Sequence, residues 1–181
     1  MNQTFVDRDT AIRTVSADDS GGPRIAPTSC SQQALWVLGQ VLPQESVYNE
    51  SDVFRLKGVL DIEALKDAVN EIVRRHDVLR TRFAVEDGEP VQVIAPELKV
   101  SLEVTDLSAL PDGEREAEAQ RHTRDDARAG FDLEHGPLIR VRLLRLERDE
   151  HWLLQTMHHI VRDGGSMVVF AKELSILYGA Y

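Results

Sequence analysis

The residues best suited to chemistry are two adjacent histidines, His158 and His159, which Asp163 and Gly164 follow after a gap of three residues. A neutral histidine with a pKa near the ordinary value of about 6.5 can accept a proton from a nucleophile or hold that nucleophile by a hydrogen bond. Backbone N–H groups at the start of a helix beside it would stabilise a developing oxyanion. The pattern therefore predicts proton transfer, or orientation of a nucleophile, at this turn.

The elements on either side of the turn must position these histidines. Residues 152–157 are mostly apolar and predict a buried strand, whereas residues 166–181 predict a helix. Neighbouring residues on a strand point to opposite faces, so we expect one histidine to be buried or structural and the other to be available for proton transfer. Asp163 is the expected N-cap of a helix that begins at Gly164.

Other kinds of site have less support. Ser166 is an ordinary residue at a helix N-terminus, and the sequence offers no clear triad for it. A metal ion needs three or four converging ligands, and His135 and His151 have no recognised ligand spacing to the histidine pair, so we predict no metal site. Cys30 is the single cysteine and is interpreted as a small apolar filler, which indicates a reducing, cytoplasmic compartment.

Length and charge exclude several classes of protein. A chain of 181 residues is long enough for one domain with a hydrophobic core. Its net charge of -10 argues against nucleic acid as a partner, because phosphate binding needs a basic face. No apolar run is long enough to cross a membrane, and the N-terminus lacks the pattern of a secretion signal. Residues 1–27 are polar and aperiodic, so they are expected to form a flexible leader before a folded part at 28–181.

The folded part mixes helices with pairs of strands. Four helices are predicted, one capped by Thr28 or Ser29 and ending before Pro43, and others at 62–76, 114–129 and 166–181. Strands are predicted at 53–56, 79–85, 90–95, 100–104, 138–147 and 151–157. This order predicts an α/β sandwich with a mixed or mostly antiparallel sheet.

Two helices carry more specific expectations. Asp61 precedes the helix at 62–76 and is its expected N-cap. The last helix is expected to bury Val168 or Val169 together with Leu174 and Leu177, which recur at helical spacing.

Three segments carry a resemblance to a known family. Residues 158–164 match the HHxxxDG signature of nonribosomal peptide synthetase condensation domains, chloramphenicol acetyltransferase and related acyltransferases. Residues 75–83 resemble the condensation-domain motif RHxxLRTxF, and residues 29–36 resemble the motif SxAQxRLW. The three motifs in this order make the chain similar to a condensation domain over about residues 27–181.

The chain departs from the family pattern at three positions. Ser31 replaces the usual alanine and Ala34 the usual arginine of the first motif, and Gly165 stands where many relatives carry a bulky residue. The residues after Gly164 do not resemble the continuation found in epimerisation domains. Heterocyclisation domains replace the histidine pair with aspartates, so the resemblance favours condensation.

The resemblance implies roles for single residues. His159 would stand at the reacting centre, as base or as positioner of the acceptor amine, whereas His158 would be structural. Asp163 would pair with an arginine of the second motif, with Arg75 as first choice and Arg80 as second. Loss of either partner of such a buried pair would cost roughly 3–5 kcal/mol. The alternative for Arg75 is a partner of the helix dipole at a solvated helix end.

The resemblance also implies a fold, partners and an activity. The expected fold is a chloramphenicol acetyltransferase-like lobe whose C-terminal counterpart is absent, so we expect no catalysis by this lobe alone and self-association through the exposed face. Donor and acceptor peptidyl carrier proteins would supply phosphopantetheine arms, and Gly164 would let an arm pass close to the backbone. The implied activity is amide-bond formation between two carrier-bound groups. The alternatives are acyl transfer to a free alcohol or amine, and a non-catalytic lobe that docks carriers.

Overall fold

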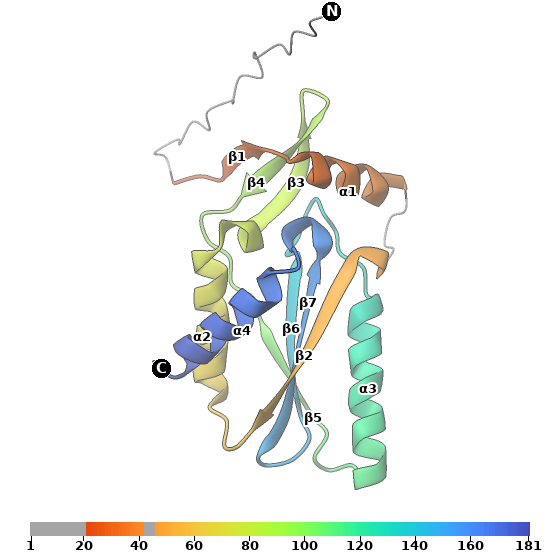
Figure 1. The fold of residues 1–181 in the computed structure, drawn as a ribbon, viewed down its shortest axis with the longest axis vertical. Coiled ribbons are helices and arrows are strands. Elements are labelled where there is room, and N and C mark those ends of the chain that lie inside the picture. Colours follow the sequence, from red (N-terminus) through yellow and green to blue (C-terminus); the bar gives the residue numbers. More distant parts are fainter. Residues whose placement is uncertain (1–20, 42–45) are drawn as a thin grey trace, which may run out of the picture.

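A four-stranded sheet forms the centre of the molecule in this computed structural model, which describes residues 21–41 and 46–181. Its strand order is β2-β7-β6-β5, and the bounds are Asn49–Lys57 for β2, Glu150–His158 for β7, Ile139–Arg145 for β6 and Leu102–Asp106 for β5. The pairs β2–β7 and β7–β6 are antiparallel, whereas β5 runs parallel to β6. The predicted α/β fold with a mixed, mostly antiparallel sheet is therefore confirmed (Figure 1).

A second, three-stranded sheet lies at the end of the molecule near the described N-terminus (Figure 1). It has the order β1-β4-β3, with β1 at Arg24–Pro27, β4 at Glu89–Ile94 and β3 at Thr81–Glu86. Asp87 and Gly88 join β3 to β4 with φ values of 53° and 84°, the left-handed geometry of a tight hairpin turn.

Strand β1 corrects the prediction of a flexible leader at residues 1–27. Residues 24–27 are ordered because they pair antiparallel with β4, from Arg24 opposite Ile94 to Pro27 opposite Val91. A strand of four residues is too short to show a clear alternation of apolar and polar residues, and its hydrogen bonds come from a strand distant in the sequence. Residues 1–20 of the predicted leader lie outside the described residues.

Helices cover both faces of the central sheet. Helices α2 (Ile62–Arg75) and α4 (Ser166–Tyr178) pack on one face, where the core includes Leu153 and Met157 of β7. Helix α3 (Asp112–Arg128) covers the opposite face, where Trp152 and Leu154 lie. The alternation of these β7 residues shows that the strand is buried on both sides. Asp61 accepts a hydrogen bond from the backbone N–H of Ala64 at 3.1 Å, so its predicted role as N-cap of α2 is confirmed.

The buried face of α4 differs from the prediction at one position. Val168 is 62% exposed and Val169 is 47% exposed, whereas Leu174 and Leu177 are buried as predicted. Phe170 is buried instead, and its ring stacks on that of Phe54 in β2 with centroids 6.2 Å apart. Residues 170, 174 and 177 then form one apolar stripe at helical spacing.

Helix α1 (Cys30–Val41) packs by a single buried tryptophan. The side chain of Ser29 accepts from the backbone N–H of Gln32, and Gln32 accepts in return from the backbone N–H of Ser29, a capping box. Trp36 is buried against Phe83 of β3, with ring centroids 6.3 Å apart. Cys30 is exposed, so the interpretation of this cysteine as an apolar filler is wrong.

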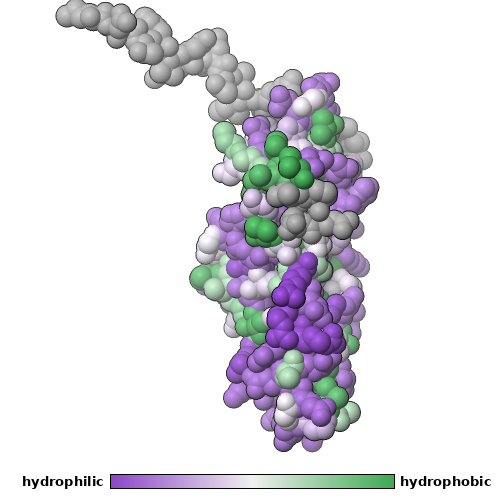
Figure 2. Space-filling view, turned by 90° about the vertical axis from the view of Figure 1, so that its right-hand side faces the viewer, coloured by the Kyte–Doolittle hydropathy of each residue, from purple (hydrophilic) through white to green (hydrophobic). Residues whose placement is uncertain are grey.

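The surface differs between the two ends of the molecule. On the side where α3 lies, the lower part is mostly hydrophilic, and hydrophobic residues gather toward the end that holds α1 (Figure 2). Helix α1 exposes Val37, Leu38 and Val41. None of the helices in the described ranges combines the length and apolar character that a membrane crossing requires.

Candidate active site

The two histidines lie where the central strand β7 ends. His158 is the last residue of β7, and His159 is the first residue of a short 3-10 turn, His159–Val161. His158 is 5% exposed, whereas the side chain of His159 is 46% exposed. The change of environment between neighbours is the one expected from strand alternation, since one side chain enters the protein and the next one leaves it.

His158 is held as a neutral imidazole. Its Nδ1 accepts a hydrogen bond from the backbone N–H of Ile160 at 3.1 Å, and its ring centroid lies 6.1 Å from that of Tyr48 and 6.3 Å from that of Phe131. Burial, and to a smaller extent the neighbouring His159, lower the pKa of His158 to about 4. Because Nδ1 accepts, the proton of the neutral ring is on Nε2.

His159 has a carboxylate partner. Its Nδ1 lies 2.5 Å from Oε1 of Glu50, the second residue of β2. A carboxylate at this distance favours a proton on Nδ1, which leaves Nε2 as the nitrogen available to a reaction partner.

Arg162 connects the histidine turn to β2. Its side chain is 7% exposed, and its Nε lies 2.9 Å from Oε2 of Glu50. Its Nη1 lies 2.6 Å from Oδ2 of Asp52, which is on the same face of β2 two residues further on. Glu50, Asp52 and Arg162 were not among the site residues predicted from the sequence. The available signal was a pair of acidic residues at strand spacing and an arginine that directly follows the two apolar residues of the turn.

Asp163 organises the start of α4. Its Oδ1 accepts hydrogen bonds from the backbone N–H groups of Gly165 at 3.1 Å and Ser166 at 3.0 Å, and from the Ser166 hydroxyl at 2.7 Å. The Ser166 hydroxyl, followed by these N–H groups, lowers the pKa of Asp163. Asp163 therefore satisfies N–H groups at the helix start as predicted, although α4 begins at Ser166 and not at Gly164.

The predicted ion pair between Asp163 and an arginine is wrong. Arg75 lies on Glu71, one turn earlier in α2, with Nε and Oε1 2.8 Å apart. Arg80 lies on Asp77, with 2.5 Å between Nη2 and Oδ1. Among the described residues no arginine pairs with Asp163, because Arg75 and Arg80 each find a carboxylate three or four residues away and Asp163 is used by α4.

A pocket of about 340 Å³ lies beside the turn, between α2 and α4. Val161, Asp163 and Gly165 line it on one side, and His76 and Leu79 line it on the other. Gly165 contributes no side chain to this space, and an added Cβ at Gly164 would meet nothing within 4 Å. The pocket and the open backbone leave room for an extended group next to the turn. In the described part of the chain, no three His, Cys, Asp or Glu residues converge as metal ligands.

The fold and this turn together define a class of protein. The sheet is mixed, and its central strand leads into a buried histidine, an exposed histidine and then the start of a helix. This is the arrangement expected of an HHxxxDG lobe. Residues 23–181 match the family model of the condensation domain, so the chain belongs to the condensation domain family.

Proteins of similar sequence include peptide synthetases. A linear gramicidin synthase of Brevibacillus parabrevis is 41% identical over 172 residues, which cover 95% of this chain and 2% of that protein. Phosphinothricin tripeptide synthetase PhsC of Streptomyces viridochromogenes is 44% identical over 162 residues, which cover 90% of this chain and 15% of that protein. The chain thus spans a small part of the length of the relatives it matches.

Solved structures of condensation domains share the fold. The starter condensation domain of rhizomide synthetase RzmA has a TM-score of 0.80 and 28% identity, and the match covers 86% of this chain and 39% of that one. A variant of that domain is known in complex with C8-CoA, with a TM-score of 0.79 to this chain. The first condensation domain of the CDA synthetase has a TM-score of 0.78 and 27% identity, with 85% of this chain and 40% of that one covered.

Proposed function

We propose that this chain is the N-terminal lobe of a condensation domain that joins a carrier-bound acyl or peptidyl thioester to the amine of a carrier-bound aminoacyl group. The observation that carries the proposal is the environment of His159. This histidine is exposed, its Nδ1 contacts Glu50, and its Nε2 does not take part in that contact. Membership of the condensation domain family gives the reaction class.

The chemistry follows from the two histidines. The amine nitrogen attacks the thioester carbonyl, the new C–N bond forms and the C–S bond breaks. Nε2 of His159 would orient the amine and accept its proton, and the departing thiolate takes up a proton as the thiol. His158 stays neutral at pH 7 because of its lowered pKa and supports the turn by accepting from Ile160.

Both substrates would arrive on phosphopantetheine arms of donor and acceptor carrier proteins, and this chain would hold no cofactor of its own. Coenzyme A ends in the same arm, and a variant of the rhizomide synthetase domain is known in complex with C8-CoA. The open backbone at Gly164 offers a passage for an arm. The single cysteine fits a protein that works in the reducing cytoplasm.

The proposal includes a requirement for a second lobe. The matched condensation domains are more than twice as long as the part matched here, since 39% and 40% of their chains are covered. We therefore expect the 181-residue chain alone to form no amide in a single-turnover assay with loaded carriers. Amide formation by this chain alone would contradict the requirement.

The decisive experiment compares two variants in the two-lobed domain. His159→Ala is expected to abolish turnover and to leave folding intact, because the side chain is half exposed. Asp163→Asn is expected to retain most of the turnover and to stay folded, because asparagine keeps an acceptor for the N–H groups at the helix start and no buried pair is broken. Full turnover by the first variant would overturn the assignment of His159.

The acceptor also separates the proposal from its nearest rival. A condensation domain should use an amine on a carrier and should bind loaded carrier protein. Transfer to a free alcohol with no carrier binding would identify an acyltransferase of the same superfamily instead.

A further inference from the structure

We propose that Glu50 is a positioning residue for His159, and that Arg162 and Asp52 hold Glu50 in place. The proposal rests on the proposed function of His159, but it is argued from contacts of β2 that the HHxxxDG motif does not contain. Glu50 touches no substrate in this scheme and acts through the imidazole.

The two oxygens of Glu50 have different partners. Oε1 lies 2.5 Å from Nδ1 of His159, and Oε2 lies 2.9 Å from Nε of Arg162. A carboxylate this close to Nδ1 favours the tautomer with a proton on Nδ1, so the lone pair is on Nε2. This is the tautomer that a base for the acceptor amine requires.

The charges of the cluster are balanced only after proton transfer. Glu50 and Asp52 supply two negative charges, and Arg162 supplies one positive charge, so the cluster is negative while His159 is neutral. When Nε2 takes the amine proton, the imidazolium becomes the second positive charge. A fixed carboxylate beside a histidine stabilises such an imidazolium without taking its proton.

Arg162 prevents Glu50 from turning away. Its side chain is 7% exposed and lies between the two carboxylates, with Nη1 2.6 Å from Oδ2 of Asp52. If Glu50 turned away from the turn, its carboxylate would lose the attraction of this guanidinium, and Arg162 would keep Asp52 alone. Glu50 is therefore held toward His159 from the side of the turn.

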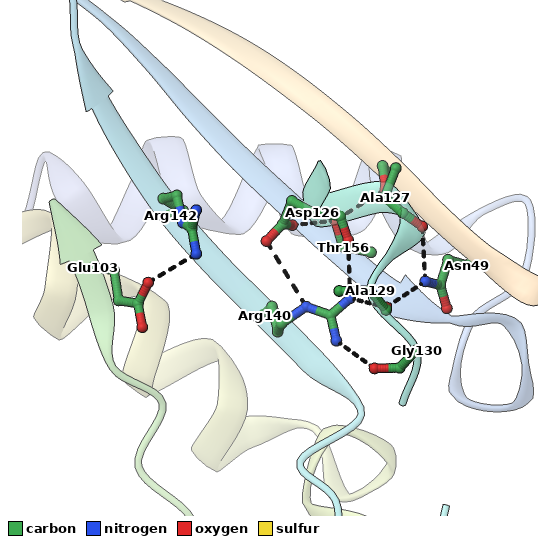
Figure 3. Close-up of polar contacts among 10 residues, drawn as sticks. Asn49, Glu103, Asp126, Ala127, Ala129, Gly130, Arg140, Arg142 and Thr156 are labelled. Atoms are coloured by element: carbon green, nitrogen blue, oxygen red, sulfur yellow. Dashed lines mark hydrogen bonds and ion pairs between the residues drawn. The ribbon is translucent and has the colours of Figure 1, made fainter. Parts of the chain in front are cut away.

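The backbone of Glu50 is held by its neighbours on the other face of the sheet. Asn49 donates to the carbonyl oxygens at the end of α3, with both distances 2.8 Å. Ser51 and Thr156 share a hydrogen bond of 2.9 Å, and Thr156 donates to the buried Asp126 at 2.7 Å. Figure 3 shows Asn49, Thr156 and Asp126 gathered at the end of α3, over the strands of the central sheet. The residues on both sides of Glu50 are thus anchored.

Kinetics of the two-lobed domain test the positioning role. Glu50→Ala should lower kcat by about 10–100-fold, the usual effect of losing a group that orients a reacting ligand, with KM for the loaded carriers within about 2-fold. Glu50→Asp should recover part of the loss, because it restores a carboxylate. The matched control is Glu103→Ala, which removes an exposed carboxylate that pairs with Arg142 at 2.9 Å on the same sheet (Figure 3) and should leave kcat unchanged.

Imidazole ¹⁵N spectra of the 181-residue chain give a readout independent of activity. In its neutral form, His159 of the wild-type chain should be protonated on Nδ1, and the nearly isosteric Glu50→Gln should shift it toward the Nε2-protonated tautomer. An unchanged tautomer in Glu50→Gln, or an unchanged kcat in Glu50→Ala, would overturn the proposal. If the wild-type two-lobed domain forms no amide, the proposed function fails, and the spectra still test the role of Glu50.

Discussion

The lowered pKa of His158 makes the stability of this protein depend on pH in a defined window. The pKa is about 4 in the folded chain against 6.5 for an unperturbed histidine. Between these values the unfolded chain binds a proton that the folded chain does not, so the free energy of unfolding decreases as the pH falls from 6.5 to 4. The contribution is fully present above pH 6.5. Between pH 7 and pH 5 these two values give a loss of about 2 kcal/mol.

The variant that tests this is His158→Asn. The asparagine keeps an acceptor for the backbone N–H of Ile160 and removes the titrating ring. Urea unfolding at pH 7 and pH 5 should show a difference about 2 kcal/mol smaller in His158→Asn than in the wild type. The matched control Phe131→Leu removes one aromatic neighbour of His158 and keeps the imidazole, so it should retain most of the pH dependence. An equal pH dependence in His158→Asn and wild type would refute the reasoning.

Three further outcomes are expected in urea unfolding at pH 7. Arg75→Ala should lower the free energy of unfolding by less than about 1 kcal/mol, because its pair with Glu71 is a surface pair. A loss of roughly 3–5 kcal/mol would instead support a buried pair with Asp163. Asp61→Ala should cost about 1 kcal/mol through the lost cap, whereas Asp61→Asn should cost less; equal losses would contradict the capping role. Leu153→Ala, at a fully buried position of β7, should cost about 2–5 kcal/mol, and a loss below about 1 kcal/mol would contradict the packing of the central strand.

The sequence predicts those parts of the fold whose signals are local. The helix after Asp61 has its cap and its apolar period within fifteen residues, and α2 begins and ends within one residue of the prediction. The alternation of His158 and His159 also depends on one strand alone. The position of the site at a strand end was predictable for the same reason.

The missed features depend on pairing between distant segments. Strand β1 exists because β4 lies beside it, about 65 residues later in the chain. The choice of Phe170 over Val168 in the core depends on Phe54, which periodicity within α4 cannot reveal. The contact between Glu50 and Arg162 depends on the register in which β2 pairs with β7, which the sequence of either strand does not reveal. Arg75 pairs with Glu71, a nearby carboxylate that is not part of the family motif.

The strand order has a consequence for the time at which the site forms. In the described sheets β2 pairs with β7 alone, so Glu50 has no sheet to join until β7 has been made. About 110 residues separate Asn49 from its partner His158, and synthesis at about 5–20 residues per second leaves β2 unpaired for roughly 5–20 s. During this interval both edges of the nine-residue strand β2 are unpaired, so another chain could pair with it. The carboxylate and the histidine therefore meet late in folding, and the nascent chain is most prone to aggregation before they do.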